Sequence, residues 1–207
     1  MLPKDALNRA DLVSARSLPG PAPARWDRAA LAGRLTELSA AGASAGLTLA
    51  CALVLDAQQH GEPVAWIATE ESAFYPPDVA EGGVDLDALA VVRVPRLAQT
   101  FRAADHLARS GAFGLLVLDL GERPRMPAAA QSRLAGLAGR HDTSILCLTR
   151  KDARDPSLGS LVSLRGEAVR ERRGDNRLSC RVHILKDKRR GPGWEYEEVC
   201  RGPDGLR

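Results

Sequence analysis

Residues 36–71, TELSAAGASAGLTLACALVLDAQQHGEPVAWIATEE, constrain the fold more than any other part of the chain. They contain a short apolar run, a turn rich in glycine and alanine, a long apolar helix pattern and a second apolar run. A buried strand followed by a glycine-containing turn and a helix is the setting of a phosphate-binding loop. The stretch therefore predicts a strand–turn–helix–strand unit of an α/β protein.

The alternation of apolar runs and helical patterns continues along the chain. Runs such as LLVL and ILCL are apolar throughout, as in strands that helices cover on both faces. Strands that alternate with helices form parallel sheets with right-handed crossovers. We therefore expect an α/β fold with a mainly parallel sheet sandwiched by helices. The expected strands are residues 34–38, 63–68, 89–94, 114–120 and 143–149, and the expected helices are residues 47–61, 97–111 and 127–141.

Beyond Arg150 the pattern changes to three strand-like runs, joined by turns at residues 174–176 and 191–193. The run SCRVHIL, residues 179–185, alternates apolar and polar side chains, which is typical of a strand with one wet face. We expect these runs to form an antiparallel C-terminal extension of the sheet.

Residues 1–25 differ from the rest of the chain in their sequence pattern. Leu7 and Leu12 lie at helical spacing within residues 4–16, and a Pro-Gly-Pro sequence ends the pattern. We divide the chain into an arm, residues 1–25, and a core domain, residues 26–207. The arm is expected to contribute to self-association or docking, with a helix packed on its own domain as the alternative.

Basic residues concentrate toward the C-terminal end. Residues 165–190 contain ten Arg or Lys against four acids, although the net charge of the whole chain is only +3. Such a cluster indicates a surface for DNA phosphates or an acidic partner, with solvated strand and turn charges as the alternative. Only Trp194 and Tyr196 lie nearby for base stacking, so any DNA contact is expected to be weak and non-specific. The candidate surface residues are Arg165, Arg170, Arg172, Arg173, Lys186, Lys188, Arg189 and Arg190.

The cysteine and histidine spacings do not indicate a metal site. The four cysteines show no CxxC spacing, and the four histidines are scattered. The sequence has no signal peptide and no apolar span of the length that a membrane helix needs. We expect no metal, no membrane association and a location in the reducing cytoplasm.

The turn before the first long helix departs from a phosphate-binding loop at two positions. In the pattern G-x-x-x-x-G-K-[ST], Gly46 and Thr48 match, but Ala41 replaces the first glycine and Leu47 replaces the lysine. Losing a charge-assisted contact to phosphate costs about 1.5–3 kcal/mol, or roughly 10- to 100-fold in affinity. We therefore expect a vestigial site, with no hydrolysis and no bound cofactor.

Two acids occupy positions that suit a nucleotide site. Asp119 ends the apolar run LLVLDL, as a metal-positioning acid does at the carboxyl edge of a strand, and a cap on the next turn is the alternative. Glu70 ends the run WIATEE, where an acid would activate water, and Glu70 with Glu71 also fits a solvated pair. Together with Gly46, Leu47 and Thr48, these two acids complete the vestigial nucleotide site.

These stretches resemble the core of the bacterial recombinase RecA over most of the chain. GRLTEL and residues 46–71 are similar to the RecA loop, helix and second strand, and AADHLARSGAFGLLVLDL is similar to the stretch that ends in the Walker B aspartate. The resemblance implies that Glu70 and Asp119 stand at the catalytic glutamate and the Walker B aspartate of that family. It also implies that Lys186 and Lys188, in RVHILKDKRRGP, correspond to two interfacial lysines.

The chain departs from RecA in several places. It lacks the loop lysine, and Arg150 stands where RecA has a nucleotide-sensing glutamine. The loop that grips single-stranded DNA is shortened to residues 151–160, and the separate C-terminal domain of RecA is not expected. A short RecA-like chain with these losses resembles the ImuA family of the bacterial damage-inducible mutagenesis cassette.

The ImuA resemblance implies a non-catalytic adaptor in SOS-induced translesion synthesis. Its implied partners are RecA, an ImuB-like Y-family polymerase homologue and a DnaE-type polymerase. A SulA-like cell-division inhibitor that binds FtsZ is one alternative. A RecA-like ATPase that receives Lys186 or Lys188 from a neighbouring subunit is the other.

Overall fold

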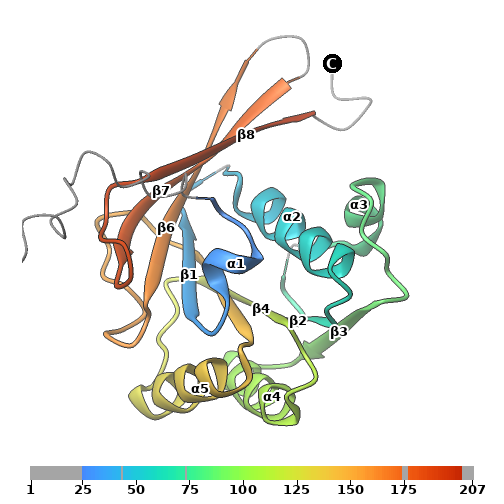
Figure 1. Cartoon of the computed structure of the whole chain (residues 1–207), viewed down its shortest axis with the longest axis vertical. Helices are drawn as coiled ribbons and strands as arrows, with labels where there is room; N and C mark the ends of the chain where they lie inside the picture. Colours follow the sequence, from blue (N-terminus) through green and yellow to red (C-terminus); the bar gives the residue numbers. More distant parts are fainter. Residues whose placement is uncertain (1–24, 43, 73, 174–176, 202–207) are drawn as a thin grey trace, which may run out of the picture.

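A computed structural model describes residues 25–42, 44–72, 74–173 and 177–201 of the 207-residue chain. One eight-stranded sheet crosses this part of the molecule in the order β3–β2–β4–β5–β1–β6–β7–β8 (Figure 1). The strands are β1 Leu35–Ala40, β2 Val64–Thr69, β3 Leu89–Val94, β4 Leu115–Glu122, β5 Ser144–Arg150, β6 Leu164–Arg172, β7 Arg177–Asp187 and β8 Glu195–Arg201. The helices are α1 Arg28–Leu31, α2 Gly46–Gln59, α3 Pro76–Glu81, α4 Leu97–Ser110 and α5 Ala128–His141.

The sheet is parallel from β3 to β6 and antiparallel from β6 to β8. The expected α/β fold with an antiparallel C-terminal extension is confirmed. One detail differs from the expectation, because β6, the first of the three C-terminal runs, pairs in parallel with β1. The last register pair of β1 and β6 joins Ser39 to Glu167, so β6 continues alone with β7 beyond the end of β1.

All five expected parallel strands and all three expected long helices are present, with ends within two residues of the predicted positions. The short helices α1 and α3 are not predicted by the sequence analysis. Each has a local signal that would have located it. The Asp27 side chain accepts a hydrogen bond from Ala30 N (2.9 Å) and caps α1, whereas Pro76 opens α3 at a position that proline favours.

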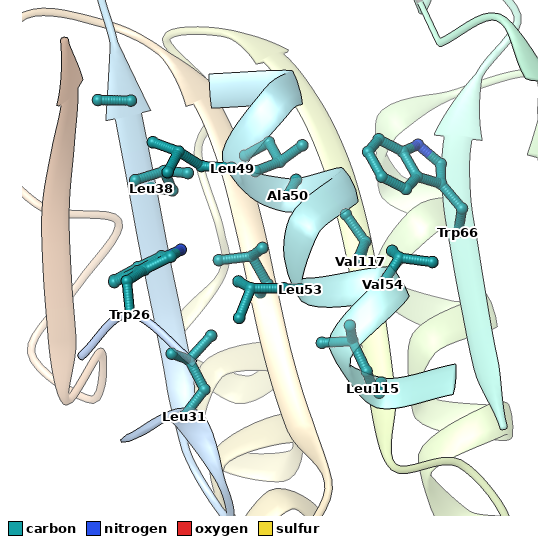
Figure 2. Packing of buried hydrophobic residues seen from close by; sticks show 14 of the residues in the cluster. Trp26, Leu31, Leu38, Leu49, Ala50, Leu53, Val54, Trp66, Leu115 and Val117 are labelled. Atoms are coloured by element: carbon teal, nitrogen blue, oxygen red, sulfur yellow. The ribbon is translucent and has the colours of Figure 1, made fainter. Parts of the chain in front are cut away.

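Helices cover both faces of the parallel part of the sheet (Figure 1). Buried residues of α2 recur three or four positions apart, so one apolar stripe of this helix faces the sheet. Figure 2 shows Leu49, Leu53 and Val54 of this stripe against the sheet residues Leu38 and Val117. Helices α4 and α5 pack in a second apolar cluster on the opposite face. The carboxyl edge of the sheet is therefore the place where loops from both layers meet.

Several expectations concern residues that the structure does not describe. Leu7, Leu12 and the expected helix 4–16 lie outside the described residues, and so does the expected turn 174–176. The division of the chain into an arm and a core domain at residue 25 stays a prediction.

Three observations on the described part of the chain concern its helices, its possible metal ligands and its thiols. None of its helices is both long enough and apolar enough to cross a bilayer. Within the same residues, no three or more His, Cys, Asp or Glu side chains come together in a metal-binding arrangement. Burial raises the pKa of the Cys51 thiol to about 12 and also raises the pKa of Cys147, so both act as small apolar side chains.

Candidate functional site

The turn between β1 and α2 lies at the carboxyl edge of the sheet, where open α/β sheets bind ligands. Gly42 has a φ of +62°, a left-handed conformation that glycine adopts without strain. The hydroxyl of Ser44 accepts a hydrogen bond from Gly46 N (3.2 Å). The first turn of α2 then presents Thr48 and Leu47, which is 41% exposed. An apolar side chain thus meets solvent where a phosphate-binding loop has its lysine.

The two expected acids, Glu70 and Asp119, lie at this same edge on neighbouring strands. Strands β2 and β4 pair so that Ala68 is beside Asp119, and Glu70 follows two residues later. Asp119 accepts hydrogen bonds from the Ser72 hydroxyl and from Gly121 N (3.3 Å). Both carboxyl groups line one cleft, so the structure brings together the two acids that the sequence singled out.

The cleft has a volume of about 500 Å³ and a polar lining. Four of its residues are acidic, and they face two arginines, Arg96 and Arg150. None of these six charged groups takes part in the ion pairs found among the described residues. Gly46, Leu47 and Thr48 do not line the cleft, so the turn and the acids form separate surfaces. The lining residues are Thr69, Glu70, Glu71, Ser72, Pro95, Arg96, Leu97, Asp119, Leu120, Gly121, Glu122 and Arg150.

Arg93 of β3 fixes the loop that carries Ser72. Its guanidinium donates to the carbonyl oxygens of Thr69 (3.2 Å) and Phe74 (2.7 Å). The Ser72 hydroxyl accepts from Phe74 N (3.1 Å) and donates to Asp119. Arg93 therefore positions the hydroxyl that contacts Asp119. Arg93 is not among the expected site residues, because nothing near it in the chain indicates this role.

A second ionic centre lies inside the molecule, beneath the segment 151–163 that connects β5 to β6. Glu37 of β1 is completely buried, and the Lys151 ammonium lies 2.5 Å from its Oε1. The carboxylate also accepts hydrogen bonds from Thr149 Oγ1 (3.2 Å), Ser157 Oγ (2.9 Å) and Leu158 N (2.9 Å). Both oxygens of this buried charge are thus paired, as burial requires. The sequence analysis did not predict this centre.

Arg165, which the sequence placed on the basic surface, is only 5% exposed. Its guanidinium donates to the carbonyl oxygens of Asp155 (2.6 Å) and Asp152 (3.1 Å). Its Nε lies 3.9 Å from Glu37 Oε2. The assignment of Arg165 to a partner or DNA surface is therefore wrong. Its position on β6 directs the side chain into the protein, beneath segment 151–163.

Lys186 and Lys188 also contact segment 151–163. Lys186 Nζ donates to the carbonyl oxygens of Gly159 (3.4 Å) and Ser160 (3.3 Å), and Lys188 Nζ donates to that of Ser160 (2.7 Å). The structure thus places both expected interfacial lysines against a loop of their own chain.

The other basic residues of the expected surface are exposed, but their charges are not equally free. Arg173 pairs with Glu197, which Arg181 also approaches at 3.8 Å. Arg189 donates to the carbonyl oxygen of Ala32 (3.0 Å). Of this set, Arg170, Arg172, Arg189 and Arg190 form no ion pair among the described residues. The unbalanced positive charge is therefore smaller than the composition suggests.

The strand order, with the turn before α2 and Asp119 of β4 at one edge, defines an open α/β domain of the kind that binds ligands at the carboxyl edge of its sheet. Comparison with known families makes the assignment more specific, because the RecA N-terminal domain family model matches residues 29–129. The fold is therefore RecA-like, as expected, and residues 29–129 are similar to the RecA N-terminal domain.

The curated relatives described here are also RecA proteins. The RecA protein of Fusobacterium nucleatum subsp. nucleatum is 38% identical over 87 residues, which cover 42% of this chain and 23% of that protein. The RecA protein of Rhodospirillum rubrum is 30% identical over 137 residues, 57% of this chain and 37% of that protein. The RecA protein of Nocardioides sp. is 40% identical over 88 residues, which cover 42% of this chain and 25% of that protein. The matched region thus spans well under half the length of these RecA proteins.

Proposed function

We propose that this protein is a non-catalytic RecA-like accessory protein of SOS-induced translesion mutagenesis. In this proposal it is an adaptor between RecA and an error-prone complex of an ImuB-like polymerase homologue and a DnaE-type polymerase. The similarity to RecA over residues 29–129 supports a role in DNA repair. A complete α/β core that lacks the phosphate-binding lysine supports a role in binding partners rather than in hydrolysis.

The exposed side chain of Leu47 is the observation that carries the proposal. The N-terminus of a helix attracts phosphate through its free amides and its dipole. Phosphoryl transfer also needs cations that neutralise charge in the transition state. Leu47 provides no such cation at the start of α2. The arrangement therefore favours a site that no longer hydrolyses nucleotide.

A RecA-like ATPase that receives a lysine from a neighbouring subunit is less well supported. Lys186 and Lys188 both donate to the carbonyl oxygen of Ser160 in their own chain. Either lysine would have to leave this contact before it reached a nucleotide on another subunit.

Restoring the missing cation tests the role of Leu47. We expect the wild-type protein to show no binding of a fluorescent ATP analogue with Mg²⁺ at millimolar nucleotide. Leu47→Lys is expected to raise the affinity by about 10- to 100-fold, because it adds one charge-assisted phosphate contact. Fluorescence anisotropy measures both proteins. The matched control is Leu86→Lys, since Leu86 is exposed to a similar degree, 37%, but lies ahead of β3.

Micromolar nucleotide binding by the wild-type protein would overturn the non-catalytic assignment. If Leu47→Lys bound no better than Leu86→Lys, the apolar side chain at the start of α2 would not be the reason for the lost affinity.

Co-purification tests the adaptor role separately. We expect the tagged protein to retain purified RecA and the ImuB-like homologue in the absence of nucleotide. Purified FtsZ serves as the competing partner in the same assay. Retention of FtsZ alone would reject the adaptor and favour a division inhibitor.

A further inference from the structure

Segment 151–163 is held in place by side chains that lie beneath it. Arg165, Lys186 and Lys188 donate to its carbonyl oxygens. Glu37 accepts hydrogen bonds from two of its residues. A segment fixed in this way loses little conformational entropy when a partner binds to its outer side. It therefore forms a pre-organised surface.

The exposed side chains of this segment, together with those that contact it, carry a net positive charge. Carbonyl oxygens satisfy the hydrogen-bonding groups of the lysines but do not cancel their charge. Burial and the neighbouring charge of Lys188 lower the pKa of Lys186, as expected where cations crowd together. A partner that docks here is therefore acidic. The cations that reach the surface are Arg123, Arg154, Lys186 and Lys188, and the acids are Asp152 and Asp155, whereas Glu37, Lys151 and Arg165 are buried beneath the segment.

Two exposed leucines adjoin the same contact. Leu161 is 39% exposed and follows Ser160, and Leu185 is 36% exposed and precedes Lys186. Lys186 Nζ donates a hydrogen bond to the Ser160 carbonyl oxygen, so each leucine is the neighbour in sequence of a residue in this one contact. Leu185 is also the extra residue of a β-bulge between β7 and β6, and such bulges redirect a side chain. The surface thus offers apolar groups among cations.

We propose that segment 151–163, with Leu161, Leu185, Lys186 and Lys188, is a docking surface for an acidic protein segment that carries apolar side chains. The acidic groups of the partner meet the lysines, and its apolar groups cover the leucines. A nucleic acid would satisfy the charge but leave both leucines in water, so the chemistry favours a protein partner. The inference goes beyond the adaptor role, because it specifies the surface and the chemistry of its partner.

Binding of designed probes to the full chain tests this surface. The fluorescein-labelled probes are a glutamate peptide with leucine at every third position, the same peptide with serine for leucine, and an oligo(dT) strand. The wild-type protein is expected to bind the leucine peptide roughly tenfold more tightly than the serine peptide. Leu161→Ser combined with Leu185→Ser should remove this preference. Leu86→Ser, at a leucine of matching exposure (37%), should retain it.

Both leucine positions are on the surface, so the Tm of the double variant should equal that of the wild-type protein. Lys188→Glu is expected to weaken binding of both peptides. Three outcomes would overturn the proposal: no binding of the leucine peptide at millimolar concentration, a leucine preference that survives the double substitution, or oligo(dT) binding tighter than that of either peptide.

Discussion

Glu37→Gln is expected to lower the free energy of unfolding by about 3–5 kcal/mol. The substitution keeps the shape of the side chain but removes the negative charge that lies between Lys151 and Arg165, whose side chains are 5% and 6% exposed. Both cations then stay buried without a counter-ion, and the cost of desolvating them is no longer offset. Urea denaturation followed by circular dichroism measures the change.

Glu62→Gln is the matched control for this substitution. Glu62 also contacts a guanidinium, that of Arg28 at 3.3 Å, but its side chain is 35% exposed. Such surface pairs contribute about 0–1 kcal/mol, so the control should unfold almost like the wild-type protein.

Hydrogen exchange adds a local measurement to the same pair of variants. Amides in residues 151–163 should exchange faster in Glu37→Gln and at an unchanged rate in Glu62→Gln. Equal stability and equal exchange in the two variants would contradict the view that Glu37 holds this segment in place.

The parallel part of the sheet could be predicted because its signals are local. Strands β4 and β5 are short apolar runs that helices bury on both faces, and the stripe of α2 repeats at helical spacing. The positions of Glu70 and Asp119 followed from the same reasoning, since the carboxyl ends of parallel strands meet at one edge. These inferences need no knowledge of distant contacts.

The buried charges could not be predicted, because their surroundings come from far along the chain. In β1, LTELSA, three of the six residues are polar, a composition that indicates contact with water. All six residues are nevertheless buried, and segment 151–163 covers Glu37 and supplies its hydrogen-bond partners. The partners Ser157 and Leu158 are 120 and 121 residues from Glu37. Arg165 looked like a surface cation for the same reason.

Asp187→Asn should also cost about 3–5 kcal/mol at neutral pH. The Asp187 side chain is 1% exposed and lies 2.7 Å from Arg34 Nη2, which belongs to a side chain that is 4% exposed. It also accepts hydrogen bonds from Trp194 Nε1 (3.1 Å) and Arg189 N (2.8 Å). Asparagine removes the charge that offsets burial of the guanidinium, so the folded state loses a fully desolvated pair. Urea denaturation at several pH values measures the effect.

The pH dependence of this loss has a definite sign. Burial opposes ionisation of Asp187, but hydrogen bonds from Arg189 N, Arg34 and Trp194 outweigh it and hold the pKa below the ordinary value of 3.8. A carboxyl group whose pKa is lowered in the folded state stabilises the protein above its unfolded pKa. That stabilisation is lost as the pH falls through the folded pKa. The difference between wild-type protein and Asp187→Asn should therefore be constant from pH 7 to about 5 and shrink below about 4.

Asp105→Asn separates this effect from that of an ordinary ion pair. Asp105 of α4 accepts a hydrogen bond from Arg109 Nε (2.8 Å) and lies 3.4 Å from Arg133 Nε, and such surface pairs contribute about 0–1 kcal/mol each. If Asp187→Asn cost no more than this control, Asp187 would not be the ionised partner of a buried arginine. A difference that stayed constant down to about pH 3 would contradict the lowered pKa.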